Sequence, residues 1–304
     1  MSTAIEAGWL VESVGVRHLE SWGVIRVQGE DARSWLNGQI TNDVAEPAPG
    51  EAKRALCTTH KGRIIADLWV LDEGRSMLLL VPLEALEGLL STLERFIVME
   101  DVELTRLGLA VLSAQGPRAL ETLGDRAGWR VDRLGRGGVD RLVPLASLEG
   151  ELDALRREAE ARGGGLVSAE GWELARIRAG RAAYGRDFDI ETYPAEAGLV
   201  DEAVSFDKGC YVGQEAVGKL QHRGKAPRRL VHLALDGWAE PGTPLSVEGT
   251  RLGELRSCVR DPEAGVIALG YLRRAQAEPG VRVRAGEVEG RVLALLDEPL
   301  AARR

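Results

Sequence analysis

The sequence predicts an α+β fold followed by a β-barrel, and three observations lead to that prediction. Strand-like and helix-like stretches alternate from about residue 20 to residue 180. A short pattern of strand, glycine and helix occurs twice, and the two copies are offset by 87 positions. From residue 229 onward only strand-like pieces and turns follow. Strands and helices that alternate and then give way to strands alone are typical of an α+β region joined to a barrel.

The repeated pattern is weak but regular. Residues 22–28 are typical of a strand, and a helix can begin at Asp31 with an apolar face of Ala32, Trp35 and Leu36. Residues 107–116 and 117–124 repeat that order, with proline at the start of the second helix and glycine at its end. In register, Gln28 matches Gln115, Gly29 matches Gly116, Ala32 matches Ala119 and Leu36 matches Leu123. The repeat indicates two related α+β halves.

The remaining elements follow from periodicity and turn signals. Residues 52–58 and 62–71, with THK between them, predict a β-hairpin. Further strands are predicted at 76–82 and 101–107, and helices at 83–98, 148–162 and 169–179. Strand-like pieces occur at 228–235 and near 244–258, 265–271 and 281–296. Ala226–Pro227–Arg228 marks a boundary between residues 1–226, the α+β region, and residues 227–304, the barrel.

Composition limits the classes of protein to consider. The chain has 304 residues, 44% hydrophobic and 28% charged, which is typical of a globular protein with a sizeable core. A net charge of −8 argues against a general nucleic-acid binder. There is no apolar run long enough to cross a bilayer and no signal-peptide pattern, so we expect no membrane partner. Three widely spaced cysteines favour a reducing cytoplasm over a disulfide framework or a cysteine zinc site.

The stretch KGCYVGQE, residues 208–215, is the most unusual in the chain. Gly209 and Gly213 free the backbone on both sides of Cys210, so we expect the chain to bend sharply there. The Lys208 ammonium, two residues before the thiol, could favour the thiolate by direct charge attraction. A buried cysteine in a glycine-rich turn fits the same residues, because free cysteines are often buried.

A basic stretch follows at 218–229, and it contains Arg223 and Lys225. In an acidic protein this local positive charge suits an anionic ligand or an acidic partner, although a solvated loop fits equally well. His222 lies in the same stretch and could act as a base for Cys210 if the two side chains meet.

Two further stretches contain carboxylates. Asp67 is isolated in an apolar strand, where a period of two places it on the same face as Ile65 and Trp69. Such a carboxylate either points to solvent or lines a pocket. Residues 184–199 contain several carboxylates, but the ligand order and central glycine of a calcium loop are missing, so we expect no metal site.

Four stretches together resemble one family: 29–43, 60–70, 176–199 and KGCYVGQE. The last is similar to the signature of the YgfZ-type folate-binding proteins, which are relatives of the aminomethyltransferase (T-protein) of the glycine cleavage system. The resemblance implies a T-protein-like arrangement of three domains around a central folate channel, with a C-terminal β-barrel. It also implies tetrahydrofolate as the cofactor, and support of iron–sulfur cluster assembly or repair, with iron–sulfur proteins or their assembly machinery as partners.

The resemblance also implies roles for particular residues. Cys210 would be the functional thiol, with Lys208 beside it, and Asp67 would lie in the channel near the folate. The region around Arg223 would lie near the same ligand. For a folate, Tyr211 or Trp69 could supply a stacking surface, and Arg223 or Lys225 could contact the acidic tail.

One difference from the T-protein pattern leaves a second function open. The T-protein strand typically has two adjacent acidic residues where this chain has Ala66 and Asp67. A single carboxylate provides fewer groups for acid–base catalysis than an adjacent pair does, and this difference favours the thiol-dependent role. The alternative is a folate-dependent one-carbon transferase of the aminomethyltransferase or demethylase type.

Overall fold

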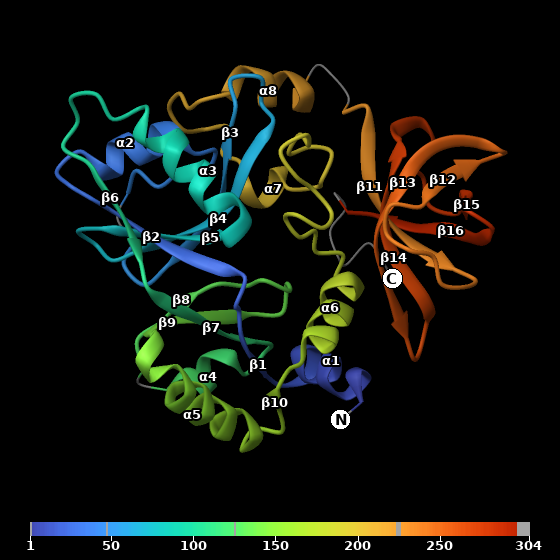
Figure 1. Ribbon diagram of the computed structural model, residues 1–304, viewed down its shortest axis with the longest axis horizontal. Coiled ribbons are helices and arrows are strands. Elements are labelled where there is room, and N and C mark those ends of the chain that lie inside the picture. Colours follow the sequence, from blue (N-terminus) through green and yellow to red (C-terminus); the bar gives the residue numbers. More distant parts are fainter. Residues whose placement is uncertain (1, 47, 125, 223–225, 297–304) are drawn as a thin grey trace.

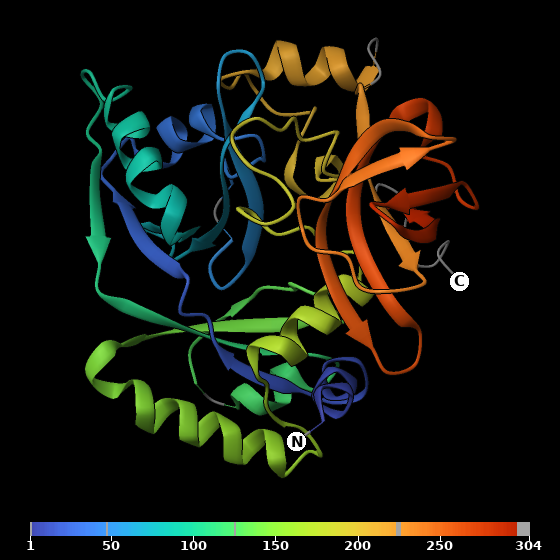
Figure 2. The same ribbon diagram turned by 45° about the vertical axis from the view of Figure 1, so that its right-hand side comes forward.

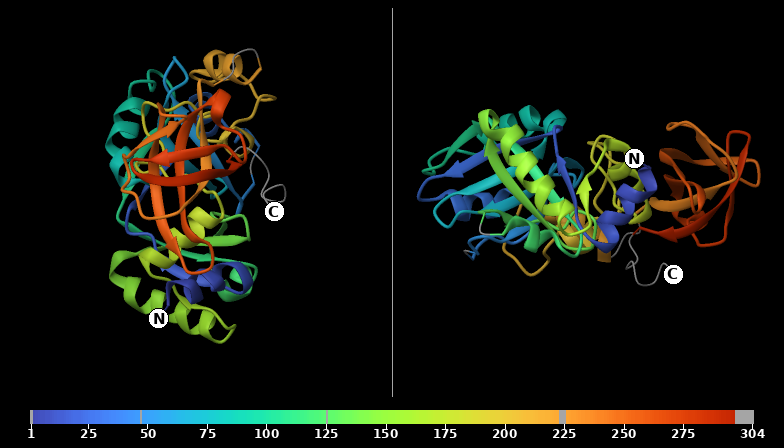
Figure 3. Two further views of the ribbon diagram at one scale, coloured as in Figure 1. Left: turned by 90° about the vertical axis from the view of Figure 1, so that its right-hand side faces the viewer. Right: turned by 90° about the horizontal axis from the view of Figure 1, so that it is seen from below.

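The computed structural model describes residues 2–46, 48–124, 126–222 and 226–296, which form three structural units (Figure 1). Two α+β units lie one above the other in Figure 1, and a β-barrel lies beside them. The barrel forms one end of the molecule when it is seen from below (Figure 3). The α+β fold with a C-terminal barrel is therefore confirmed. Within the described ranges, no helix has the length and apolar character needed to span a membrane.

The first α+β unit contains the predicted hairpin. Its five strands are ordered β3-β4-β5-β2-β6. Their bounds are Trp22–Gln28 (β2), Ala52–Thr58 (β3), Ile64–Asp72 (β4), Met77–Pro82 (β5) and Glu103–Leu107 (β6). Helices α2 (Ala32–Gln39) and α3 (Leu83–Glu94) bury their apolar faces against one side of the sheet. Helix α3 ends before the predicted residue 98, and the chain beyond it still packs Phe96 and Ile97 on the same core.

The second α+β unit has the strand order β10-β1-β7-β9-β8. Its strands are Gly15–His18 (β1), Leu109–Gln115 (β7), Trp129–Arg130 (β8), Gly138–Pro144 (β9) and Gly165–Leu166 (β10). Helices α1 (Thr3–Glu12), α4 (Ala119–Leu123) and α5 (Leu148–Glu160) accompany it, with a 3-10 turn at Leu145–Ser147. A core cluster that includes Leu71 and Leu80 of the first unit and Val111 of the second joins the two sheets.

The two copies of the sequence repeat have the same local form. Gly29 follows β2 with φ +128°, and Gly116 follows β7 with φ +120°. A Cβ on Gly29 would lie 2.0 Å from the Asp101 carbonyl oxygen, and one on Gly116 would lie 2.5 Å from that of Ser13. Both the positive φ and the close approach require glycine. The chain then enters α2 in one unit and α4 in the other.

The barrel is closed, with the strand order β11-β14-β13-β12-β15-β16. Its strands are Arg228–Leu235 (β11), Pro244–Val247 (β12), Thr250–Asp261 (β13), Gly265–Arg273 (β14), Arg282–Ala285 (β15) and Val288–Leu295 (β16), with a 3-10 turn at Arg274–Gln276. Helix α6 (Ala169–Arg178) lies between the second unit and the barrel (Figure 2). Arg178 at its end makes a bidentate ion pair with Asp261 of β13, both contacts at 2.6 Å.

A long connection from α6 to the barrel has little regular structure, as its glycines and prolines predict. It contains the short helices α7 (Val200–Ala203) and α8 (Gln214–His222). It packs over β3 and α2 near the top of Figure 1. KGCYVGQE lies between these two helices and runs into α8.

Candidate functional site

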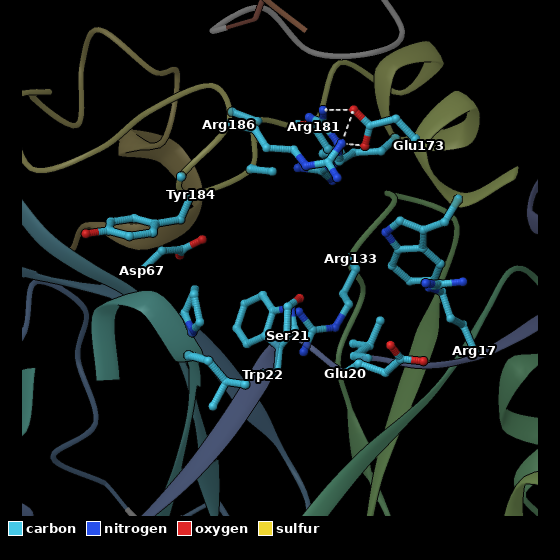
Figure 4. Close-up of a pocket in the computed structure, with 18 of the residues that line it drawn as sticks. Arg17, Glu20, Ser21, Trp22, Asp67, Arg133, Glu173, Arg181, Tyr184 and Arg186 are labelled. Atoms are coloured by element: carbon cyan, nitrogen blue, oxygen red, sulfur yellow. Dashed lines mark hydrogen bonds and ion pairs between the residues drawn. The ribbon is translucent and has the colours of Figure 1, made fainter. Parts of the chain in front are cut away.

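A cavity of about 590 Å³ lies where the two α+β units meet α6 (Figure 4). Its walls come from β2 and β4 of the first sheet, from the connection around Arg133, from α6, and from residues 181–186. The volume falls within the range of small-molecule pockets. Distant segments of the chain therefore converge on one concave site.

Asp67 lies in the cavity wall and is 3% exposed, so the pocket-lining alternative for this residue holds. Arg54 of β3 binds it in a bidentate ion pair, with Nε to Oδ1 at 2.9 Å and Nη2 to Oδ2 at 2.8 Å. The third guanidinium nitrogen of Arg54 donates to Glu202 at 3.0 Å. Arg54 thus fixes both carboxylate oxygens, each of which still has a lone pair that a ligand donor can use.

Four aromatic side chains supply flat apolar walls: Trp22, Trp69, Trp172 and Tyr184. Trp69 shares the strand face of Asp67, as the period of two predicts, whereas Ile65 lies at a β-bulge between two paired residues. Tyr184 lies beside Asp67 in Figure 4, and its hydroxyl donates to the Ile65 carbonyl at 2.9 Å. Burial, helped by nearby carboxylates, raises the pKa of Tyr184 to about 12, so this phenol remains a neutral donor.

Six arginines line the cavity, which is notable in a chain of net charge −8. Arg133 is paired with the buried Asp140 at 2.6 Å and stacks on the Trp22 ring, 4.2 Å from its centroid. Arg176 is paired with Glu173 and Asp187 at 2.6 and 2.5 Å. Arg17 donates to the Val167 carbonyl at 3.0 Å and makes no ion pair with any described residue. Glu20, Asp67, Glu84 and Glu173 also line the cavity, so Arg17 is the arginine best able to attract an anionic group.

Lys208 lies outside this cavity and is buried, with 9% of the residue exposed. Nζ donates to the carbonyl oxygens of Asn37, Ile40 and Asn42, at 2.5, 2.9 and 2.7 Å. These oxygens lie at and beyond the end of α2, where a helix leaves carbonyls unpaired and favours a cation. All three ammonium protons are used, so Lys208 fastens KGCYVGQE to the first unit. Burial lowers the pKa of Lys208 to about 8.

Cys210 is exposed, which rules out the alternative of a buried cysteine. The chain bends at Gly213, which has φ +87° and lies where a Cβ would be 2.4 Å from the Thr59 carbonyl oxygen. Tyr211 is 7% exposed, its ring lies 5.5 Å from the Lys208 ammonium, and burial raises its pKa to about 12. The segment thus buries its lysine and its tyrosine and presents the thiol to solvent.

The structure brings only some of the predicted site residues together. Asp67 and Trp69 line the cavity, whereas Lys208, Cys210 and Tyr211 form a second group that is absent from the lining. Arg223 and Lys225 lie outside the described residues, as does the side chain of His222. Their predicted roles therefore stay predictions.

Sequence reasoning missed several cavity residues, chiefly Arg54, Arg133 and Trp22. Arg54 had a usable signal, because it is a charged residue in a strand that pairs with the strand of Asp67. The register opposes Arg54 to Trp69, so a hairpin alignment would have placed it beside Asp67. Arg133 comes from the second unit and carried no such local signal.

Comparison with solved structures defines the class of protein. The crystal structure of glycine cleavage system aminomethyltransferase T from Bartonella henselae matches with a TM-score of 0.83 and 21% sequence identity. The match covers 96% of this chain and 88% of that chain. This protein therefore has the T-protein fold that the resemblance implied.

Sequence comparison then identifies the family. The family model described as the GCVT N-terminal domain matches residues 2–134. A probable aminomethyltransferase of Natronomonas pharaonis is 31% identical over 315 residues, which cover 93% of this chain and 87% of the relative. A putative chloroplastic transferase of Arabidopsis thaliana is 28% identical, over 90% of this chain and 68% of its own length. The chain belongs to the aminomethyltransferase family.

Proposed function

We propose that the central cavity binds tetrahydrofolate and that the chain supports the assembly or repair of iron–sulfur proteins through the Cys210 thiol. The observation that carries the folate part is the cavity itself, with Asp67 held by Arg54 among aromatic walls and arginines. The KGCYVGQE segment, which resembles the YgfZ-type signature, supports the thiol part. The proposal places the protein in the cytoplasm.

The side chains in the cavity fit a folate in three respects. A pterin is flat and apolar on its faces, which matches walls made by Trp22, Trp69 and Tyr184. Its ring edge carries N–H donors, which the free lone pairs of Asp67 can accept. Its tail carries carboxylates, for which Arg17 is the cavity arginine without an ion pair to a described residue. Bound tetrahydrofolate would supply nitrogen atoms that can carry a one-carbon unit.

The protein's own residues would position such a ligand and exclude water. Arg54 fixes both Asp67 oxygens, so the acceptor is preorganised before binding. Arg133 is held by Asp140 and lies flat on Trp22, so that wall is rigid and cationic. With its raised pKa, Tyr184 remains protonated at neutral pH, and its proton is already donated to a backbone carbonyl.

Anaerobic calorimetric titration with tetrahydrofolate tests the cavity. We expect saturable binding by the wild type and about tenfold weaker binding by Asp67→Asn, because an amide loses one charge-assisted acceptor. Asp72→Asn is the matched control, since Asp72 lies in the same strand and also makes a bidentate pair, with Arg33, but is outside the cavity. Equal weakening by both variants, or no binding at millimolar ligand, contradicts the folate proposal.

Cell strains test the thiol part of the proposal. Cys210→Ser is expected to lower the activity of iron–sulfur enzymes as much as deletion of the whole chain does. Cys258→Ser is the control, because Cys258 lies in the barrel strand β13 and is only partly buried. Unchanged iron–sulfur enzyme activity in the Cys210→Ser strain rules out this role.

A folate-dependent one-carbon transferase is the second candidate, and the names of the relatives favour it. This function predicts that the protein forms product from N-methyl or aminomethyl donors. Asp67→Asn should then lower the rate of product formation more than Cys210→Ser does. Cys210 is exposed and does not line the cavity, so its thiol would take no part in that reaction. We therefore rank it below the thiol-dependent role.

A further inference from the structure

Two exposed apolar side chains stand out on the first α+β unit. Val98 is 80% exposed and Met99 is 93% exposed, and both lie in the connection from α3 to β6. Their backbone N–H groups donate to Glu100 Oε2 at 2.9 and 3.0 Å. Asp101 N donates to Asp31 Oδ2 at 2.8 Å, which ties the connection to the start of α2. Hydrogen bonds therefore fix the backbone that carries Val98 and Met99.

Next to this pair lies a shallow surface groove. Met99 and Glu100 form one side, and α2 forms the other with Trp35, Gly38 and Gln39. Its charged lining residues are Asp31 and Glu100, and no lysine or arginine in the described part of the chain lines it. The exposed Glu30 and Asp101 flank it, while the exposed Arg95 belongs to the same connection but does not line the groove. The groove combines apolar surface with negative charge.

The segment that carries Cys210 is hydrogen-bonded to one wall of the groove. The Gly38 carbonyl, at the α2 side of the groove, accepts a hydrogen bond from Val212 N at 3.3 Å. Lys208 is fastened to the Asn37 carbonyl one residue earlier. The exposed thiol thus lies in a segment that is hydrogen-bonded to the wall of the groove.

We infer that this groove is the docking surface for the partner protein whose reactive group meets Cys210. The partner segment that fits it carries an apolar side chain next to lysine or arginine. The apolar side chain would pack against the exposed Val98 and Met99, and the cations would face Asp31 and Glu100. The inference rests on the proposed thiol function, and it names the surface and the chemistry of the partner. Nucleic acid is a poor occupant, since it would meet two carboxylates.

Peptide tethering tests the surface directly. The full chain with Cys258→Ser is reacted with peptides that carry a pyridyl-activated cysteine, because Cys57 is buried and Cys210 is then the accessible thiol. Attack by the Cys210 thiolate forms the mixed disulfide and releases pyridine-2-thione, which is followed by absorbance. One peptide has leucine between two lysines, a second has glutamates for lysines, and a third has glycine for leucine. Each rate is divided by the rate with dipyridyl disulfide.

The lysine–leucine peptide is expected to react about tenfold faster than the glutamate peptide. Val98→Ser with Met99→Ser should remove the advantage of leucine over glycine, whereas Leu120→Ser, at a 50% exposed site on α4, should not. Asp31→Asn should reduce the preference for lysine more than Glu287→Gln in the barrel, which makes the same change in net charge. Equal normalised rates for all three peptides overturn the inference, as does a groove variant that behaves like its control.

Two further measurements separate the possible failures. If the wild type sediments as a dimer that the Val98 and Met99 variant dissociates, the occupant is a second copy and the inference is wrong. Iron–sulfur enzyme activity is then measured in strains with Cys210→Ser or with the Val98 and Met99 variant. Loss in both supports the docking surface. Loss with Cys210→Ser alone overturns the docking surface but leaves the proposed function standing, and no loss in either overturns the proposed function.

Discussion

Asp67 and Asp72 lie five positions apart in β4, and each is held by an arginine through two hydrogen bonds. They differ in what else they contact. Asp72 also accepts the backbone N–H groups of Ala48 and Gly74, so its lone pairs are used within the protein. Burial acts to raise its pKa, but these donors and Arg33 hold it below its usual range. Asp67 makes no such backbone bonds within the described residues, and its remaining lone pairs face the cavity.

The buried ammonium of Lys208 leads to a pH-dependent prediction. Burial lowers its pKa from 10.5 to about 8 in the folded protein. Between these two values the unfolded chain holds a proton that the folded chain has released, so rising pH favours the folded state over this window. We expect the free energy of unfolding of wild type, minus that of Lys208→Met, to rise from pH 8 to pH 10.5. Urea unfolding at successive pH values measures this difference.

The exposed Lys61 supplies the control for that measurement. The same difference for Lys61→Met should stay flat over the window, because Lys61 is exposed and does not lose its hydration on folding. At pH 7 Lys208→Met should lower the free energy of unfolding by about 2 kcal/mol, because three carbonyl groups lose their hydrogen-bond donor. A flat curve for Lys208 would contradict the prediction.

At the scale of elements, the glycine that follows β7 is a point where substitution should be severe. Gly116 has φ +120°, and a Cβ there would lie 2.5 Å from the Ser13 carbonyl oxygen, which is part of the backbone. Gly50, with φ +84° and open space around it, is the control. Gly50→Ala should cost about 1–2 kcal/mol from backbone conformation alone. Gly116→Ala should lower the free energy of unfolding, measured with urea, clearly more than Gly50→Ala does. Equal losses would mean that the backbone around Ser13 shifts easily to make room for the new Cβ.

Elements with a clear period were predictable from the sequence, and those without one were not. The hairpin of β3 and β4 and helix α3 have alternating or helical apolar patterns, so both were found. Helix α1 was missed because its buried face contains Glu6, whose Oε2 accepts hydrogen bonds from the backbone and the hydroxyl of Ser168. A glutamate buried by a partner 162 positions away has no local signature.

The residues of the candidate site were likewise predictable only where a local sequence pattern pointed to them. Asp67 was found because it is an isolated carboxylate in an apolar strand. Trp69 was found because the period of two places it on the same face of that strand. The approach of Arg133 and Tyr184 to them depends on how the units pack, which no spacing in the chain encodes. The separation of Cys210 from the cavity lining was likewise invisible, since both groups belong to stretches of one family resemblance.

At the scale of the molecule, the barrel shares a hydrophobic core with the rest of the chain. One cluster joins Leu230, Ile267 and Leu269 of the barrel to Leu174 and Ile177 of α6. We therefore expect the whole chain to unfold in one cooperative transition, because melting the barrel alone would expose this core. Far-ultraviolet circular dichroism follows the whole chain during urea unfolding.

Trp238 provides a separate probe of the barrel, since it is the only tryptophan after residue 172. The fluorescence difference between wild type and Trp238→Phe reports the barrel, and its midpoint should coincide with that of circular dichroism. An earlier barrel transition would show that the shared core contributes little to cooperativity.

The guanidinium of Arg54 touches both Asp67 in the cavity wall and Glu202 in α7, the helix that precedes the thiol segment. Loss of Arg54 would leave the buried Asp67 without its cationic partner, and loss of Asp67 would leave the largely buried Arg54 with only the exposed Glu202. Among homologous sequences, positions 54 and 67 should therefore change together. A lineage that abandons the ligand would be free to lose both together, while Lys208 would still hold its cysteine segment.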